Sequence, residues 1–174
     1  MLHQLSEKNR TRFRRGHKEP MGTKIIDREG HLLFEYAGDL ISARFSERNL
    51  RRADLRNLVL EGAYFDDSDL TDADLTDADL YWADFFRANL TGAILQRADL
   101  RGADLKEALL VRADLSGAKL GTDNLGGSTH LEGAHLEGAI LDGTDLTGAR
   151  YNGATVLPVG FSPSTAGMKY VSDL

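Results

Sequence analysis

Large apolar residues recur at every fifth position through the middle of the chain. From Leu55 to Leu120 each fifth position holds Leu or Phe, and in nearly every unit a small residue, mostly Ala, stands two positions earlier. A period of five fits neither the 3.6-residue period of an α-helix nor the alternation of a plain strand. It therefore indicates an internal repeat in which each unit contributes one large and one small apolar side chain.

The spacing of these two sites predicts how each unit folds. Side chains two positions apart lie on the same face of a short extended segment, so both point inward while the other three residues turn a corner. Four segments bring the chain back above its start, and stacked coils then exchange backbone hydrogen bonds at a separation of about 4.8 Å. The pattern predicts a square β-solenoid with a filled core. The narrow inward site has room only for Ala or for the similarly small side chains of Ser68, Thr129 and Thr144.

Several units share the motif A(D/N)LXX, among them RADLR, DADLT, RANLT, GADLK and RADLS. On these residues, over roughly two-thirds of its length, the chain resembles the pentapeptide-repeat proteins. The resemblance implies a right-handed quadrilateral β-helix, here of about six coils. The expected fold is an all-β solenoid with an N-terminal β-hairpin cap and a short C-terminal helical cap. A fold alone does not name a function.

Two segments precede the repeat. Residues 1–22 are a basic arm with three possible roles. The arm is a solvated segment, a tether to an acidic partner or nucleic acid, or a segment that folds back on the acidic solenoid of its own or a neighbouring chain. Residues 23–37 are expected to form a β-hairpin with its turn at Asp27–Gly30. Three apolar side chains of this hairpin share one face by alternation: Leu32, Phe34 and Tyr36. Because an open solenoid end exposes core and strand edges, the hairpin is expected to cover it.

The repeat itself is expected over residues 38–157. Its frame runs from Leu40 to Leu125 and then slips by one residue at GGSTHL, after which inward positions continue from Leu131 to Val156. Gly126 and Gly127 suggest a bulged corner that absorbs the additional residue. This irregularity is either neutral or a feature shaped for a partner.

The segment 158–174 departs from the repeat. Ser162 followed by Pro163 is typical of a helix start, so a short helix is expected from Ser162 to Val171. Its apolar side chains are expected to plug the last coil: Phe161, Met168 and Tyr170. Exposed apolar ends of this kind also pair, so the chain is expected to be a monomer or a dimer formed through the C-terminal cap.

Composition narrows the class of protein. A chain of 174 residues predicts one domain. The absence of Cys excludes disulfides and thiol chemistry and fits a reducing compartment. There is no apolar run long enough for a membrane span and no apolar core of a secretory signal near the N-terminus. We therefore expect a cytoplasmic protein that does not contact the membrane, with an Arg-rich organellar transit peptide at the N-terminus as the alternative.

The residues that usually carry catalysis or bind metals do not form a recognisable set. His130 and His135 occupy equivalent outward positions one unit apart, but no Cys accompanies them, so no zinc site is expected. No spacing supports a Ser-His-Asp grouping or a nucleotide-binding glycine pattern. A filled core also leaves no pocket of the kind that enzymes use. We expect no catalytic residues, no cofactor, no metal and no small-molecule substrate.

Charge is distributed unevenly along the chain. The formal net charge is −6, and residues 38–157 hold 21 acidic side chains against 12 basic ones. Between Asn57 and Phe86 there is no Lys or Arg, while nine Asp or Glu residues occur. Such a surface favours either simple solubility or a basic partner, and it argues against direct nucleic-acid binding because it repels phosphate.

The same region has aromatic residues at outward positions. Aromatic side chains beside acidic ones are frequent in protein-binding hot spots. The candidate partner-binding residues are Tyr64, Tyr81, Trp82, Phe86, Asp66, Asp67 and Asp84.

Two functions remain open at this stage. The first is a non-enzymatic, rigid scaffold for protein–protein interaction. The alternative follows from the resemblance: quinolone-resistance members of the family mimic DNA and bind DNA gyrase. The acidic residues favour this alternative, whereas the Leu-based core without Cys and the short C-terminal segment differ from those members.

Overall fold

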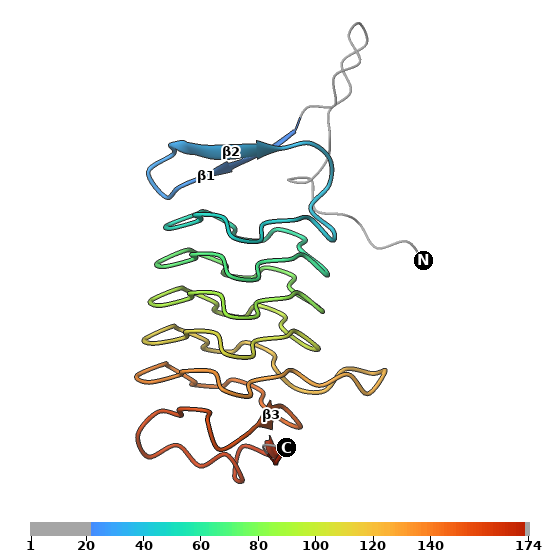
Figure 1. Ribbon diagram of the computed structural model, residues 1–174, viewed down its shortest axis with the longest axis vertical. Coiled ribbons are helices and arrows are strands. Elements are labelled where there is room, and N and C mark those ends of the chain that lie inside the picture. The colour runs from blue at the N-terminus through green and yellow to red at the C-terminus, as the bar shows by residue number, and fades with distance from the viewer. Residues whose placement is uncertain (1–21, 173–174) are drawn as a thin grey trace, which may run out of the picture.

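The computed structural model describes residues 22–172, which form a stack of coils with a β-hairpin over the first coil (Figure 1). These residues contain no helix. The strands are β1 (Thr23–Ile26), β2 (Leu32–Tyr36), β3 (Arg150–Tyr151) and β4 (Lys169–Tyr170). The fold is an all-β solenoid, as the five-residue period predicts. Apart from Gly22, the predicted basic arm lies outside the described residues.

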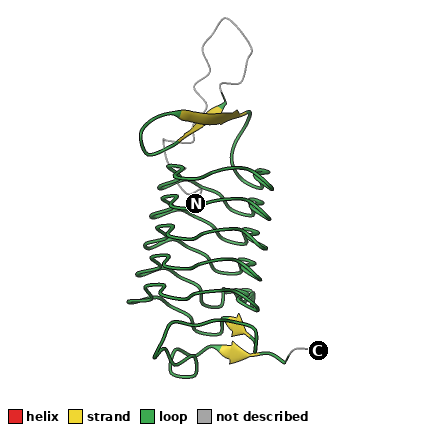
Figure 2. Cartoon of the chain, turned by 60° about the vertical axis from the view of Figure 1, so that its left-hand side comes forward, coloured by secondary structure: helices red, strands yellow, loops and turns green. Residues whose placement is uncertain are grey.

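Residues twenty positions apart stack on one another along the faces of the solenoid. Tyr64 pairs in parallel with Asp84, and Asp84 pairs with Asp104, each through a single-residue bridge. Figure 2 therefore draws most of each coil as loop, although the coils are hydrogen-bonded throughout. Between coils, the amide of Leu75 donates to the carbonyl of Ile94, and that of Leu95 donates to Asp114, each at 2.7 Å.

The core consists of columns of fully buried side chains. Leu75, Leu95 and Leu115 form part of one column and have no exposed surface. In another column the rings of Phe45, Phe65 and Phe85 are stacked, with centroid separations of 4.9 and 4.8 Å. Because every coil buries its large residue between those of its neighbours, a chain with few aromatic residues still forms a continuous core.

The antiparallel hairpin β1–β2 extends this aromatic column. The rings of Phe34 and Tyr36 lie 5.6 and 5.4 Å from that of Phe45. The prediction that Leu32 shares their face was wrong, because Leu32 is 55% exposed. The strand register shifts between Ile25 and Ile26, and Ile25 is the hairpin residue that is fully buried instead.

The Asp or Asn of the repeat motif has a structural role at the corners. The Oδ1 atom of Asp84 accepts the backbone N–H of Phe86 at 2.9 Å, and Asp104 and Asn89 do the same for the residues two positions later. A sharp turn leaves such a donor without a backbone partner, and the carboxylate or amide supplies one. Much of the acidic composition therefore follows from the geometry of the turns.

The irregular region after Leu120 is an inserted loop, and the predicted one-residue slip was wrong. Asp99 pairs with Lys119, twenty residues later, whereas Asp104 pairs with His130, twenty-six residues later. The corner thus gains six residues, and Leu125 is 84% exposed instead of inward. In a five-residue frame an insertion of six leaves the same phase shift as an insertion of one. The loop projects from the side of the stack (Figure 1).

A second shift in register follows near the end of the repeat. His130 pairs with Arg150, twenty residues later, but His135 pairs with Val156, twenty-one residues later. Val156 consequently faces outward and is 38% exposed, while Leu157 packs against the core. The prediction that Val156 is inward was therefore wrong by one position.

The predicted C-terminal helix is absent. Ser162 and Pro163 begin a single turn, in which the amide of Ala166 donates to the carbonyl of Ser162 at 3.1 Å. The turn ends at Gly167, where φ is +72°, and β4 then pairs in parallel with β3. This pairing uses the backbone that a helix would need for its own hydrogen bonds.

The apolar residues of this segment differ in their burial. Met168 is buried against the core, and Phe161 is partly buried there. Tyr170 is 59% exposed, so its predicted place in the plug was wrong, and its ring packs edge-on against Tyr151 at 5.4 Å. Across the described part of the chain, no helix has the length and apolar character that spanning a bilayer requires.

Candidate functional site

The predicted partner-binding residues lie on one face of the solenoid and on the two corners beside it. We call this the Tyr64 face and define it by its stacked outward residues, which are Arg44, Tyr64, Asp84, Asp104, His130 and Arg150. Tyr81 and Trp82 form the corner that precedes this face in its coil. The corner that follows the face carries the other three candidates: Asp66, Asp67 and Phe86.

The four aromatic candidates point outward, as the repeat frame predicts. Tyr64 and Trp82 are 41% and 50% exposed, while Tyr81 and Phe86 are partly buried. Three of them already contact arginines of this chain, and Arg101 lies 5.7 Å from the centroid of the Tyr81 ring. The guanidinium of Arg44 lies 5.6 Å from the centroid of the Tyr64 ring, and that of Arg87 lies 5.9 Å from the ring of Phe86.

Tyr81 and Trp82 are tied to the inserted loop 121–129 by Asp123, a residue that the sequence did not single out. The Oδ2 atom of Asp123 accepts the Tyr81 hydroxyl at 2.8 Å and the Trp82 indole N–H at 2.9 Å. Its Oδ1 atom accepts the amides of Leu125 and Gly127 at 2.8 and 2.6 Å. Asp123 is buried, and its carboxylate connects the corner with the loop.

These hydrogen bonds change the proton affinity of both partners. The Tyr81 hydroxyl, followed by the loop amides and the Trp82 N–H, stabilises the carboxylate and lowers the pKa of Asp123. The same bond favours the neutral phenol, so the pKa of Tyr81 is raised. Both groups are therefore held in the charge states that the contact requires near neutral pH.

Two glycines make room for the Trp82 ring. A Cβ atom at Gly102, twenty residues after Trp82, would lie 2.9 Å from the indole Nε1. A Cβ atom at Gly127 would lie 2.7 Å from the indole Cζ2. The ring thus fits between the next corner of the solenoid and the loop because neither position has a side chain.

A groove of about 510 Å³ lies between this loop and the Tyr64 face. We call it the Trp82 groove. It is lined by Tyr64, Trp82, Ala83, Asp84, Gly102, Asp104, Gly126, Gly127, Ser128, His130 and Arg150. Aromatic, acidic and basic side chains from five coils therefore meet at one concave surface.

The three titratable side chains Asp84, His130 and Arg150 lie in different electrostatic environments within the groove. Burial, and then repulsion from Asp104 and Asp66, raises the pKa of Asp84. Burial lowers the pKa of His130, so its imidazole is neutral at pH 7. Arg150 forms an ion pair with Glu132, with Nε 3.0 Å from Oε1.

The acidic stretch between Asn57 and Phe86 is partly neutralised by arginines of adjacent coils. Asp67 pairs with Arg87 at 3.2 Å and Asp77 with Arg97 at 2.7 Å. Asp69 pairs with Arg51 at 3.3 Å. These partners are distant in sequence but lie one coil away, so a reading of charge along the chain overlooks them.

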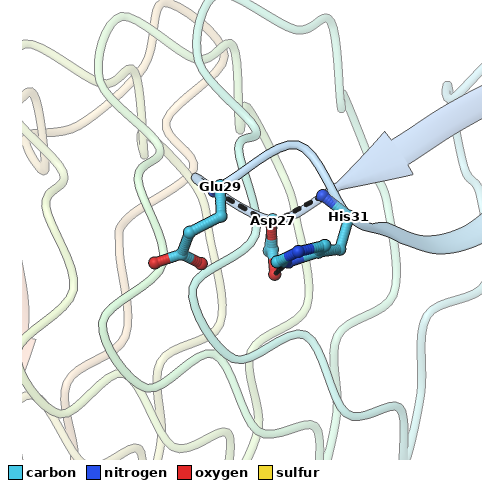
Figure 3. Close-up of side chains that lie close together, drawn as sticks. All are labelled: Asp27, Glu29 and His31. Atoms are coloured by element: carbon cyan, nitrogen blue, oxygen red, sulfur yellow. Dashed lines mark hydrogen bonds and ion pairs between the residues drawn. The ribbon is translucent and has the colours of Figure 1, made fainter.

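A separate group of possible metal ligands occurs in the turn between β1 and β2. Ligand atoms of Asp27, Glu29 and His31 lie within 4.8 Å of one another. Figure 3 shows the Asp27 carboxylate against the His31 ring, where Nδ1 is 2.9 Å from Oδ2. Asp27 also accepts the amides of Glu29 and His31, and Glu29 forms an ion pair with Arg52. The turn itself accounts for this cluster.

Comparison with known proteins identifies the repeat. The family model for pentapeptide repeats matches eight copies, over residues 39–77, 49–85, 83–121 and 128–155. The chain belongs to the pentapeptide repeat family. The matched ranges leave out most of the loop 121–129, which is consistent with its being an insertion in the repeat.

Solved structures of the same family are similar to this chain. A pentapeptide repeat protein from Nostoc Pcc 7120 is 31% identical, with 75% of this chain and 86% of that one covered and a TM-score of 0.46. HetL, a pentapeptide repeat protein involved in heterocyst differentiation regulation in Nostoc sp. strain PCC 7120, is 35% identical, with coverage of 62% and 54% and a TM-score of 0.39.

The plasmid-mediated fluoroquinolone resistance protein QnrB1 is 22% identical, with 84% of this chain and 69% of that one covered and a TM-score of 0.42. No protein with a curated description matches the chain in sequence. These similarities concern the repeat and name no partner for this chain.

Proposed function

We propose that this pentapeptide repeat protein is a non-enzymatic scaffold that binds another protein through the Tyr64 face and its two corners. The observation that carries the proposal is the group of outward aromatic side chains beside acidic ones on this face and its two corners. Tyr64 and Trp82 are two of the ten large apolar side chains that the described residues leave exposed. Interfaces are enriched in Tyr and Trp, which also account for much of the binding energy.

The rigidity of the frame supports this role. The Phe and Leu columns are fully buried, and each coil is hydrogen-bonded to the next. A surface held in this way loses little conformational entropy on binding. The partner therefore meets side chains at fixed spacing instead of a surface that must first become ordered.

The geometry of the histidine in the groove favours a non-catalytic role. Within residues 22–172 the Nδ1 atom of His130 has no hydrogen-bond partner. A nucleophile–histidine–carboxylate relay needs an acceptor at one ring nitrogen to orient the imidazole. The Nδ1 atom of His130 therefore lacks the acceptor that such a relay uses to orient its histidine.

The gyrase-binding alternative receives less support. A DNA mimic presents a regular, unopposed series of negative charges, whereas Asp67, Asp69 and Asp77 are each paired with an arginine. A supercoiling assay with DNA gyrase tests it. Inhibition at micromolar protein would favour mimicry over the scaffold role described above, and its absence would remove the alternative.

The oligomeric state is a separate question. Val159 is fully exposed at the C-terminal end, beside a shallow depression lined by Leu141 and the segment 158–161. A dimer through this end, a monomer, and a cytoplasmic location all stay predictions. Light scattering of wild type and of Val159→Asp distinguishes the two oligomeric states.

Affinity capture from the cells that make the protein tests the scaffold role. The variants are Tyr64→Ala and Phe86→Ala, with Leu109→Ala as the control, because Leu109 is similarly exposed but lies on another face. We expect a protein captured by wild type and by the control to be lost with the first two variants. Equal capture by all four proteins would show that the Tyr64 face is not the binding surface.

A further inference from the structure

We propose that the Trp82 groove receives an arginine side chain of the protein partner. This inference rests on the proposed function, because it assigns a chemistry to the partner that the Tyr64 face binds. The inference follows from three observations: the order of charges along the face, the ion pairing and protonation of the basic residues in the groove, and the aromatic side chains that form its walls.

Charges on the Tyr64 face are arranged with cations at the ends and carboxylates in the middle. Arg44 lies at one end, over the ring of Tyr64, and Arg150 lies at the other, paired with Glu132. Asp84 and Asp104 are adjacent between them. Asp104 has Lys106 at 3.2 Å, but no Lys or Arg among residues 22–172 forms an ion pair with Asp84.

Lys106 lowers the pKa of Asp84 in part, but it is paired with Asp104, so within the described residues the Asp84 carboxylate has no ion-pair partner of its own. Burial and the repulsion from Asp104 and Asp66 raise the pKa of Asp84, which means that its charge is unfavourable as it stands. His130 does not offset this charge, because burial lowers its pKa and leaves it neutral at pH 7. A cation bound beside Asp84 would relieve the repulsion.

The walls favour guanidinium over ammonium. Tyr64 already contacts one guanidinium, that of Arg44, at 5.6 Å from its ring centroid. A planar guanidinium stacks on aromatic rings and forms paired hydrogen bonds with a carboxylate, whereas an ammonium is a compact point charge. Trp82 is held in place by Asp123, so this wall is formed before binding.

Peptides that differ in one side chain test the inference. Wild-type protein is titrated with capped Gly-Gly-Arg-Gly-Gly and with the same peptide carrying neutral citrulline or lysine. Trp82, the only Trp of the chain, reports binding by its fluorescence and by the NMR signal of its indole N–H. A single side chain offers few atoms, so we expect a dissociation constant on the order of 1 mM for the arginine peptide.

The expected result is a saturable change with arginine, a weaker one with lysine and none with citrulline. Asp84→Asn keeps the side-chain oxygen that accepts the Phe86 amide and is expected to weaken arginine binding about tenfold or more. Asp145→Asn, at the same repeat position on another face, is expected to leave it unchanged. No saturable change up to roughly 10 mM arginine peptide, an equal response to citrulline, or unchanged affinity of Asp84→Asn would overturn the inference.

The capture experiment separates this inference from the proposed function. If arginine peptides fail to bind while capture still depends on Tyr64 and Phe86, the face binds a partner by other chemistry and only the arginine assignment fails. If capture is also indifferent to those two residues, both proposals fail.

Discussion

The indole N–H of Trp82 donates to the carboxylate of Asp123, 41 residues later in the chain, at 2.9 Å. The hydroxyl of the neighbouring Tyr81 donates to the same oxygen at 2.8 Å. The corner chosen from the sequence as a binding surface therefore also holds the inserted loop. Trp82 remains half exposed while it does so, and it forms one wall of the groove.

Replacing Asp123 by Ala is expected to free the loop without unfolding the solenoid. The variant removes the acceptor for Tyr81, Trp82 and two loop amides, while Leu120 and Leu131 stay buried on either side of the loop. We expect the emission of Trp82 to shift to the red and the amides of Leu125 and Gly127 to exchange faster. Asp142→Ala, at an exposed carboxylate, is the control. Emission and exchange equal to wild type would contradict a role for Asp123 in holding the loop.

The same contact is expected to depend on pH at both extremes. The pKa of Asp123 is lowered from 3.8 by the Tyr81 hydrogen bond and the loop amides. The contribution of Asp123 to stability is therefore fully present above pH 3.8, and it is lost as the pH falls through the lower pKa of the folded protein. The pKa of Tyr81 is raised from 10.0 by Asp123, so its contribution is full below that value and is lost at higher pH. Titration of Trp82 fluorescence checks this, and Asp123→Ala should lack both transitions.

Gly102→Ala is expected to destabilise the protein more than Gly138→Ala. Both glycines have a positive φ, +73° and +68°, so each substitution costs roughly 1 kcal/mol for the left-handed backbone. Only at Gly102 would the new Cβ also lie 2.9 Å from the Trp82 ring, while at Gly138 its nearest neighbour is at 3.5 Å. Urea unfolding followed by circular dichroism measures the difference. Equal losses of unfolding free energy in the two variants would mean that the Trp82 ring moves aside without cost.

Phe65→Ala is expected to cost about 3–5 kcal/mol of unfolding free energy, because it empties the middle of the stacked Phe column. Phe65→Leu should cost less than about 1.5 kcal/mol, since Leu105 already fills the same column two coils later. Urea unfolding of both variants tests the packing. Similar losses for Leu and Ala would show that ring stacking, and not filled volume, stabilises the column.

The core was predictable from the sequence at the level of single residues. The large residue of each unit from Leu40 to Leu120 is fully buried, and the small site takes Ser68 and Thr129 as well as Ala. The outward direction of Tyr64 and Trp82 followed from the same frame. A repeat makes this possible because each position meets the same neighbours in every coil.

The loop and the C-terminal end were not predictable in this way. The five-residue period does not distinguish an insertion of six residues from one of one, so Leu125 was placed inward. Ser162 and Pro163 are a genuine local helix start, but Gly167 and the pairing of β4 with β3 end it after one turn.

The sequence by itself determined the solenoid, its core residues and the outward aromatic side chains, because these depend on local alternation and on a period that every coil repeats. The tertiary structure alone decided that Asp123 meets Trp82, that Arg87 and Arg97 neutralise acids of the preceding coil, and that Asp84 lies in a groove beside Tyr64. These contacts join residues that lie about twenty or more positions apart in the chain. Which residues meet in these contacts depends on the length of the insertion and on which side chains the stacked corners bring together. The five-residue period determines neither.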